Sequence, residues 1–136
     1  MRGLVVLVLL AGCAASAPPP PQVPACAPGQ TQGVLAEAFL GRNIGARPGV
    51  SAADFRAFLD TEVTPRFPDG FSVADAQGQF RGADGVIVRE AAFRLTVLLP
   101  DPAAQRARLA EVAAAYKTRF RQEAVLVVET PTCFAF

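Results

Sequence analysis

The sequence predicts an α+β fold in which one antiparallel sheet carries two helices on a single face. Three observations support this prediction. Four segments show the alternation or the short apolar runs of strands, two segments repeat apolar residues at helical spacing, and turns rich in proline or glycine separate them. The resulting order is strand, helix, strand, strand, helix, strand, which two right-handed crossovers fold into a ferredoxin-like βαββαβ layer.

The first strand and the first helix are expected within residues 35–65. Residues 35–44 have the mixed faces of a strand. Ser51 can cap the helix that follows, with Asp54 three residues later as its partner in a capping box. The apolar positions of that helix are Phe55, Phe58, Leu59 and Val63. Pro65 ends the helix, because proline lacks the N–H group that a helix uses and its ring clashes with the preceding turn.

The rest of the domain is expected to supply the other strands and the second helix. Residues 71–81 and 86–99 form two strands joined by a glycine-containing turn, and the second strand is the more apolar and therefore the central one. Asp101 followed by Pro102 predicts the start of the second helix. The apolar stripe of that helix consists of Leu109, Val112, Ala113, Tyr116 and Phe120. Residues 124–129 close the chain as the last strand.

Residues 1–12 have the order of a secretory signal peptide: a basic residue, a short apolar run and two small residues before Cys13. The apolar run is far shorter than the roughly 20 residues that span a bilayer. Residues 10–13 resemble the bacterial lipobox, in which the cysteine thiol takes a diacylglycerol and becomes the new N-terminus. We therefore predict lipidation at Cys13 and attachment to a membrane through that lipid. The alternative is an ordinary signal peptide with a chance cysteine.

The residues after the predicted anchor indicate which membrane the protein is sorted to and how the domain is spaced from that membrane. By resemblance to bacterial lipoproteins, Ala14 directly after the cysteine implies sorting to the outer membrane, with the domain in the cell envelope and facing the periplasm. Residues 13–32 contain a cluster of prolines and no charged residue, which favours an extended, semi-rigid tether. Plain disorder is the alternative and would serve the same spacer role.

Residues 33–136 are predicted to form a single domain, since a chain of this size can bury roughly two-thirds of its surface. The chain has 13 basic and 12 acidic residues and a net charge of +1, which argues against a nucleic-acid partner. Histidine is absent, which excludes a Ser-His-Asp triad, a Cys-His pair and the usual histidine-based metal sites. Only carboxylates, arginines, the tyrosine and amides remain as possible catalytic groups, and no catalytic motif is found among them. We therefore assign no catalytic residue, no metal site and no cofactor, and an enzyme remains the alternative.

Cys26 and Cys133 are the cysteines that remain once Cys13 is lipidated. An even number of cysteines in an oxidising compartment is typical of a disulfide. The predicted sheet supports the pairing independently, because its last strand lies antiparallel to the first and brings the two residues together. Free thiols and a redox-active pair are the alternatives, although the spacing is not the C-x-x-C that redox pairs usually have.

Three stretches carry a family resemblance: VTPRFPDGFSVADAQGQFRG at residues 63–82, VIVRE after it, and AAAYKTRFRQEAVLVVETPTCFAF at the C-terminus. They resemble a bacterial family of unknown function, DUF3574. The similarity extends over residues 37–133, and residues 64–70 are its most specific part. The resemblance supports the assignment of one domain and implies no activity, cofactor or site residue.

The sheet face away from the helices is the candidate binding surface. Alternation along residues 71–81 separates a polar side from a side of small and aromatic residues. The polar side is expected to be the open one and to share its face with Glu90, while Ala74, Ala76, Gly78 and Phe80 are expected to pack beneath the helices. The predicted ligand-binding residues are Asp75, Gln77, Gln79, Arg81 and Glu90. A solvated sheet face without a ligand is the alternative.

Glu62 is a candidate buried carboxylate. In a regular helix it falls within the apolar arc beside Phe55 and Leu59, where an unpaired charge would be costly and its pKa raised. The alternative is a structural ion pair between Glu62 and an arginine, for which Arg42, Arg66 and Arg89 are the candidates.

Two functions are compatible with these predictions. The first is a non-catalytic interaction domain of a lipid-anchored envelope protein, whose partner is another envelope protein or a second copy of the chain. The second is a small-molecule-binding protein or enzyme that uses the open sheet face, with two copies pairing their sheets into a dimeric barrel around the ligand. The fold analogy behind the barrel does not by itself establish a function.

Overall fold

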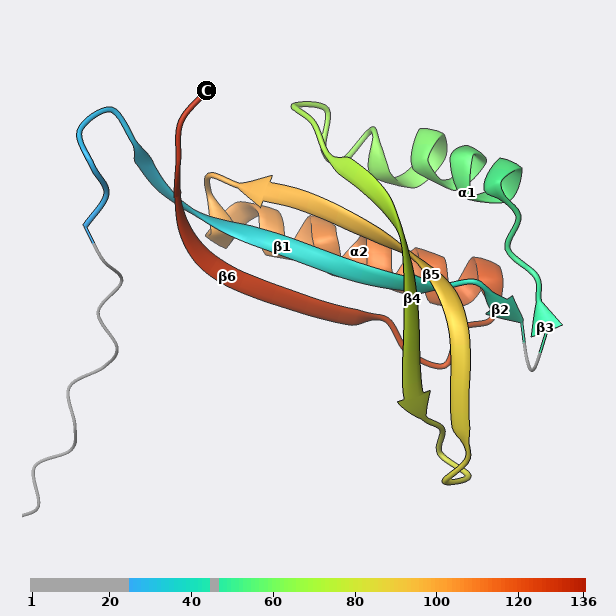
Figure 1. Cartoon of the computed structure of the whole chain (residues 1–136). Coiled ribbons are helices and arrows are strands. Elements are labelled where there is room, and N and C mark those ends of the chain that lie inside the picture. The colour runs from blue at the N-terminus through green and yellow to red at the C-terminus, as the bar shows by residue number, and fades with distance from the viewer. Residues whose placement is uncertain (1–24, 45–46) are drawn as a thin grey trace, which may run out of the picture.

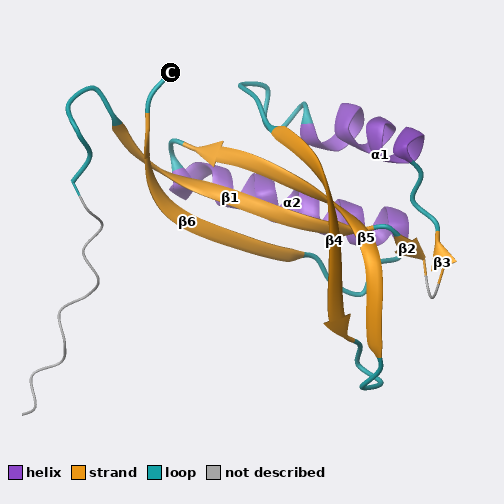
Figure 2. Ribbon diagram, in the orientation of Figure 1, coloured by secondary structure: helices purple, strands orange, loops and turns teal. Residues whose placement is uncertain are grey.

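The computed structural model describes residues 25–44 and 47–136. Its helices and strands appear in Figure 1 and, by type, in Figure 2. In chain order they are β1 (Thr31–Gly41), β2 (Asn43–Ile44), β3 (Arg47–Pro48), α1 (Ala52–Phe58), the π-helical η1 (Leu59–Val63), β4 (Ser72–Arg81), β5 (Ile87–Leu99), α2 (Pro102–Phe120) and β6 (Leu126–Phe134). Cys13, the predicted signal peptide and most of the predicted tether lie outside the described residues.

The main sheet has four strands in the order β4-β5-β1-β6, and every neighbouring pair is antiparallel. Figure 1 shows α2 behind this sheet, and α1 packs on the same side, where Phe55 stacks on Phe93 of β5 and Phe58 meets Tyr116 of α2. The α+β class and the ferredoxin-like arrangement are therefore confirmed. Hairpin β2–β3 is an addition that the sequence analysis missed, and β1 begins at Thr31, within the segment assigned to the tether, because Thr31 and Gln32 pair with β6.

The start of α1 is the predicted capping box. The backbone N–H of Asp54 donates to the Ser51 hydroxyl over 3.1 Å, and the Asp54 carboxylate accepts from the Ser51 N–H over 3.2 Å. After Phe58 the helix widens into η1, where the Thr64 N–H donates to the carbonyl group of Leu59, five residues earlier. This spacing places both Phe58 and Val63 in the core.

The core lies between the helices and the sheet. Alternate residues of β1 and β5 face the helices and are buried, while aromatic rings from α1 and α2 fill the space above them. The Phe55 ring stacks on Phe93 with a centroid separation of 3.8 Å, and the Phe58 ring meets Tyr116 edge-on at 5.1 Å. Tyr116 is fully buried. This packing fixes α2 against β1, next to the candidate site.

A disulfide joins Cys26 to Cys133, with their Cα atoms 5.5 Å apart. It closes one end of the β1–β6 pair, in which Gln32 lies opposite Cys133. The predicted pairing is confirmed. The four-stranded sheet, the core and the disulfide all lie within residues 25–44 and 47–136.

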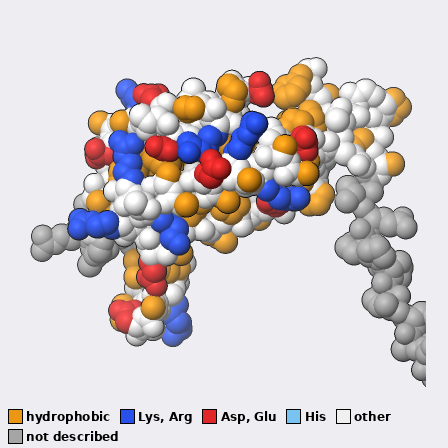
Figure 3. All heavy atoms as spheres, turned by 180° about the vertical axis from the view of Figure 1, so that it is seen from behind, with side chains coloured by type: hydrophobic (Ala, Val, Ile, Leu, Met, Phe, Trp, Pro, Cys, Tyr) orange, Lys and Arg blue, Asp and Glu red, His pale blue; other side chains and the backbone are white. Residues whose placement is uncertain are grey.

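The two faces of the molecule differ in character. Figure 3 views the helix side, where charged side chains of both signs spread over the helices. No helix within residues 25–44 and 47–136 is long and apolar enough to cross a membrane. The same residues contain no cluster of acidic and cysteine side chains that could hold a metal ion.

Candidate functional site

The strand register decides which side chains face away from the helices. Residues directly opposite each other in an antiparallel pair lie on the same face. Phe93 is buried against the helices and lies opposite Asp75, whereas Glu90 lies opposite Gly78. The open face, defined here as the sheet face without helices, therefore carries Glu90 together with Ala74, Ala76, Gly78 and Phe80 of β4.

The prediction of which alternate residues of β4 face the helices was wrong. Asp75, Gln77, Gln79 and Arg81 project to the helix side of the sheet, opposite to Glu90. The physical reason is that β4 is an edge strand which the helix layer does not cover: the Asp75 side chain is 85% exposed even on that side. Both faces of β4 therefore meet water, and alternation along the strand cannot tell which face is covered.

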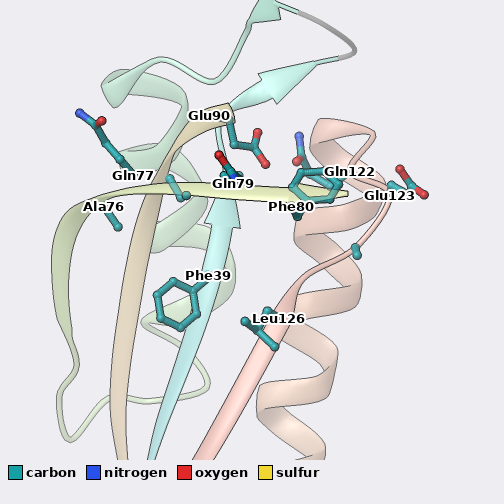
Figure 4. Close-up of a pocket in the computed structure, with 13 residues that line it drawn as sticks. Phe39, Ala76, Gln77, Gln79, Phe80, Glu90, Gln122, Glu123 and Leu126 are labelled. Carbon is teal, nitrogen blue, oxygen red and sulfur yellow. The ribbon is translucent and has the colours of Figure 1, made fainter. Parts of the chain in front are cut away.

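A pocket of about 290 Å³ opens on the open face, at the end of the sheet near the β4–β5 hairpin. We call it the open-face pocket (Figure 4). Its apolar lining consists of Phe39, Ala76, Phe80, Ala92, Ala124 and Leu126, and its polar lining includes Glu90, Gln122 and Glu123. Phe39 of β1 lies directly opposite Leu126 of β6. Four strands and the segment after α2 thus contribute to one site.

Glu90 lies against the backbone of β1. Its Oε2 atom accepts a hydrogen bond from the N–H of Asn43 over 3.1 Å. A Cβ atom on Gly41 would lie 2.6 Å from Oε1 of Glu90, which is closer than real Cβ atoms approach. Glycine at position 41 therefore provides the space that the carboxylate occupies.

The strand segment under Glu90 is held from the helix side. The Tyr116 hydroxyl donates to the carbonyl oxygen of Gly41 over 2.9 Å. The side-chain amide of Gln122 donates to the carbonyl oxygens of Asn43, over 2.6 Å, and Phe120, over 3.1 Å. Burial raises the pKa of the Tyr116 hydroxyl well above its ordinary value, and the negative charge of Glu90 raises it further.

The open-face pocket combines an apolar lining with negative charge. Among the described residues that line it, the charged ones are Glu90 and Glu123, and none is lysine or arginine. The ion pairs formed by the described side chains also leave both carboxylates without a cationic partner. The site therefore attracts groups that donate hydrogen bonds or carry positive charge, and it repels anions.

A protein-family model, described as a protein of unknown function (DUF3574), matches residues 36–136. The chain belongs to this family. The match confirms the resemblance seen in the sequence. No curated protein matches the chain.

Two solved structures of a phage SAM lyase are similar in fold. The enzyme in complex with S-methyl-5'-thioadenosine has a TM-score of 0.63 and 16% sequence identity, and the match covers 76% of this chain and 90% of that chain. The apo enzyme has a TM-score of 0.57 and the same 16% identity, with coverage of 85% and 97%. At this identity the likeness shows the fold alone.

Of the predicted ligand-binding residues of this DUF3574 domain, some border the open-face pocket and others lie outside it. Glu90 lines the open-face pocket with its side chain. Gln77 and Gln79 also border it, but their side chains project to the helix side: Figure 4 shows Gln77 pointing away from Phe39, and the Gln79 side-chain oxygen accepts a hydrogen bond from Nε of Arg89 over 3.0 Å. Asp75 instead lies near Arg42, with 3.9 Å between Oδ1 and Nη1. Arg81 lies on the helix side of β4 and does not line the pocket.

The sequence analysis missed the apolar side of the site. It assigned Ala76 and Phe80 to the packing side of β4, and it did not single out Leu126, Gln122 or Glu123 as site residues. A signal was available, because placing the last strand beside the first also brings the segment before it, residues 121–125, to the edge of the open face. The register that places Leu126 opposite Phe39 was not available from sequence.

Glu62 is not a buried carboxylate. Its side chain is 30% exposed and pairs with Arg66, with 3.0 Å between Oε2 and Nη1. The π-helical spacing of η1 explains the difference, because it turns Val63 rather than Glu62 into the core. Arg66 also pairs with Glu111 over 3.0 Å, and the hydrogen bond to that carboxylate raises the pKa of Arg66. The alternative prediction, a structural pair with Arg66, is confirmed.

Proposed function

We propose that this DUF3574 domain binds a small molecule in the open-face pocket, and that the molecule is flat, largely apolar and free of negative charge. The observation that carries the proposal is the lining of the pocket: aromatic and aliphatic side chains surround it, and its charged described residues are both carboxylates. Ligand sites commonly combine an apolar lining with a few polar groups that fix orientation.

The exposure of the apolar lining supports this proposal. Phe80 is 42% exposed and Leu126 is 60% exposed, although both border a concave surface. A flat molecule that covers Phe39, Phe80 and Leu126 would remove this apolar surface from water, which is worth roughly 25 cal/mol for each Å² buried. A phosphorylated molecule would instead bring its negative charge close to Glu90 and Glu123 and would be repelled.

The similarly folded phage SAM lyase suggests a first probe. Its structure contains S-methyl-5'-thioadenosine, a molecule with a flat base and no phosphate group. Such a molecule matches the class that the lining of the open-face pocket favours. Adenosine 5'-monophosphate carries the same base with a phosphate group, so it is the matched negative probe.

The experiment titrates residues 14–136, secreted into an oxidising compartment, with each of the two compounds and follows the backbone amide resonances. We expect S-methyl-5'-thioadenosine to shift the resonances of Gly41, Gly78 and Ala92, and adenosine 5'-monophosphate to bind at least about tenfold more weakly. Phe80→Ala should weaken binding. Val73→Ala is the control, because Val73 has nearly the same exposure, 39%, on the same strand but projects to the helix side. Equal loss in both variants, or no binding by either probe, would contradict the proposal.

We also propose that the domain is held in the cell envelope by a lipid on Cys13, at the outer membrane and facing the periplasm. The signal-like residues 1–12 support this location, and so does the disulfide, because disulfides persist in oxidising compartments. Cys13→Ala should move the protein from the membrane fraction to the soluble fraction, whereas the double variant Cys26→Ala, Cys133→Ala should stay with the membrane. A Cys13→Ala chain that still sediments with membranes would contradict the anchor.

An interaction role for the domain makes a different prediction for the same face. A protein partner or a second copy of the chain would cover the apolar side chains of the open face and close the pocket. Native mass spectrometry of residues 14–136 distinguishes the cases: a small adduct on a monomer supports ligand binding, and a dimer without an adduct supports pairing of the sheets.

A further inference from the structure

We infer that Glu90 selects the ligand of the open-face pocket, and that the ligand carries an amino or ammonium group attached to a flat ring system, directly or through a short arm. The inference rests on the proposed function and names the chemical class of the ligand more narrowly. Three features of the structure support it: the fixed position of the carboxylate, the space beside it and the charge around it.

The carboxylate is held by one of its oxygens. Oε2 accepts the hydrogen bond from the N–H of Asn43, and that segment of backbone is itself fixed by Gln122 through the Asn43 carbonyl oxygen. Among the groups that the structure describes, no hydrogen bond uses Oε1 of Glu90. One oxygen is therefore used for positioning, and the other keeps its capacity to accept a hydrogen bond from a ligand.

The space beside Glu90 is shaped by two glycines. Gly41 lies under the carboxylate, with no room for a Cβ atom. Gly78 lies directly opposite Glu90 on β4, and a Cβ atom there would meet nothing within 4 Å. The open space above Gly78 gives a donor group access to the carboxylate, while the ring system to which it is attached lies on the apolar side chains of the pocket.

The charge of the surroundings decides which donor is preferred. Ammonium and hydroxyl donors both form charge-assisted hydrogen bonds with a carboxylate, but the ammonium group adds the Coulomb attraction between opposite charges. Glu123 adds a second negative charge to the lining, and no described lysine or arginine forms a salt bridge with either carboxylate, although Arg89 and Arg121 line an adjoining cavity that shares both of them. A positively charged ligand is therefore favoured over a neutral one, and a neutral ligand over an anion.

Three probes with one skeleton test this selection: tryptamine, tryptophol and indole-3-acetate. They share the indole ring and a two-carbon arm, and they end in an ammonium, a hydroxyl and a carboxylate group. We expect residues 14–136 to bind tryptamine about tenfold more tightly than tryptophol, by calorimetry, and indole-3-acetate least of all. Glu90→Gln keeps the shape of the side chain and its acceptor for the Asn43 N–H. In this variant the preference for tryptamine should fall markedly, since Glu123 alone keeps a negative charge in the lining, with the affinity for tryptophol almost unchanged.

The control is Glu37→Gln, which removes the same charge from the same face outside the pocket, where Glu37 pairs with Arg94 over 3.5 Å. It should keep the preference for tryptamine. Equal affinity of the original chain for tryptamine and tryptophol, or a preference that is undiminished in Glu90→Gln, overturns the role of Glu90 but leaves the pocket as a binding site. Absence of binding by all three probes overturns both the role of Glu90 and the proposed function.

Discussion

The Tyr116 hydroxyl donates a hydrogen bond to the carbonyl oxygen of Gly41 over 2.9 Å. Gly41 also makes room for the carboxylate of Glu90 on the opposite side of the sheet. A single residue of β1 thus separates the aromatic core from the open-face pocket. Changes on one side of Gly41 should therefore be measurable on the other side.

Tyr116 is the single tyrosine of the chain, so its ionisation can be followed directly by the ultraviolet absorbance of tyrosinate. Burial, and then the charge of Glu90, raise its pKa in the folded state above the ordinary value of 10.0. The neutral hydroxyl therefore stabilises the fold below about pH 10, and this contribution is lost as the pH rises through the folded pKa. We expect no tyrosinate at pH 10 in the folded protein. Glu90→Gln should lower the pKa of Tyr116, and a normal titration near pH 10 without unfolding would contradict the buried hydrogen bond.

Gly41→Ala tests whether the position of Glu90, and not only its charge, creates selectivity. The new Cβ atom would lie 2.6 Å from Oε1 of Glu90, so the carboxylate must move away from the Asn43 N–H. We expect destabilisation by about 1 to 3 kcal/mol, as for other overpacked sites, and loss of the preference for tryptamine. Denaturant unfolding and calorimetry measure the two effects.

Gly78→Ala is the counterpart of that variant, because its Cβ atom would enter open space. It should leave the melting temperature nearly unchanged. It should weaken the binding of tryptamine and of tryptophol by the same factor, since it narrows the pocket without moving Glu90. A tryptamine preference that is kept in Gly41→Ala and lost in Gly78→Ala would reverse the roles that we assign to the two glycines.

The disulfide joins residues that are 107 positions apart in the chain. In the chain-entropy model a loop of this length stabilises the folded state by about 4 to 5 kcal/mol. The free energy of unfolding of the double variant Cys26→Ala, Cys133→Ala, measured by urea denaturation, should be lower by this amount. A reductant should destabilise the original chain and have no effect on the double variant. Equal stability of the two chains under oxidising conditions would contradict the prediction.

The capping box of α1 should appear in the pH dependence of stability. The side-chain and backbone hydrogen bonds from Ser51 lower the pKa of Asp54 below its ordinary value of 3.8. The ionised carboxylate therefore stabilises the fold above about pH 4, and this contribution is lost as the pH falls through the lower, folded pKa. We expect the melting temperature of Asp54→Asn to fall less steeply than that of the original chain in this acidic range. Ser51→Ala should behave similarly. Parallel curves of melting temperature against pH for all three chains would argue against the capping box.

The parts of the fold that were predictable have local signals. Ser51 with Asp54, and Asp101 with Pro102, mark the starts of the two helices, and the structure confirms both. The pairing of Cys26 with Cys133 followed from the order of the elements. In each case either residues close in sequence or a rule of topology determined the result, so no side-chain packing had to be known.

The parts that were not predictable depend on packing. The face of Asp75 is set by pairing with Phe93 at a sheet edge where both faces meet solvent. The exposure of Glu62 depends on one π-helical turn, which is stabilised by the burial of Phe58 and Val63 and has no sequence signal that we could identify. The open-face pocket requires the register between Phe39 and Leu126, which tertiary structure alone supplies.

The bridge between Cys26 and Cys133 also makes most of the domain a covalent ring. A protease that cuts one peptide bond anywhere between these two residues opens the ring, but both pieces stay joined through the sulfur atoms. The nicked chain, with the open-face pocket inside the ring, therefore remains attached to its own N-terminal segment. Two cuts, or one cut together with reduction, are needed to release any part of the pocket from whatever holds that segment.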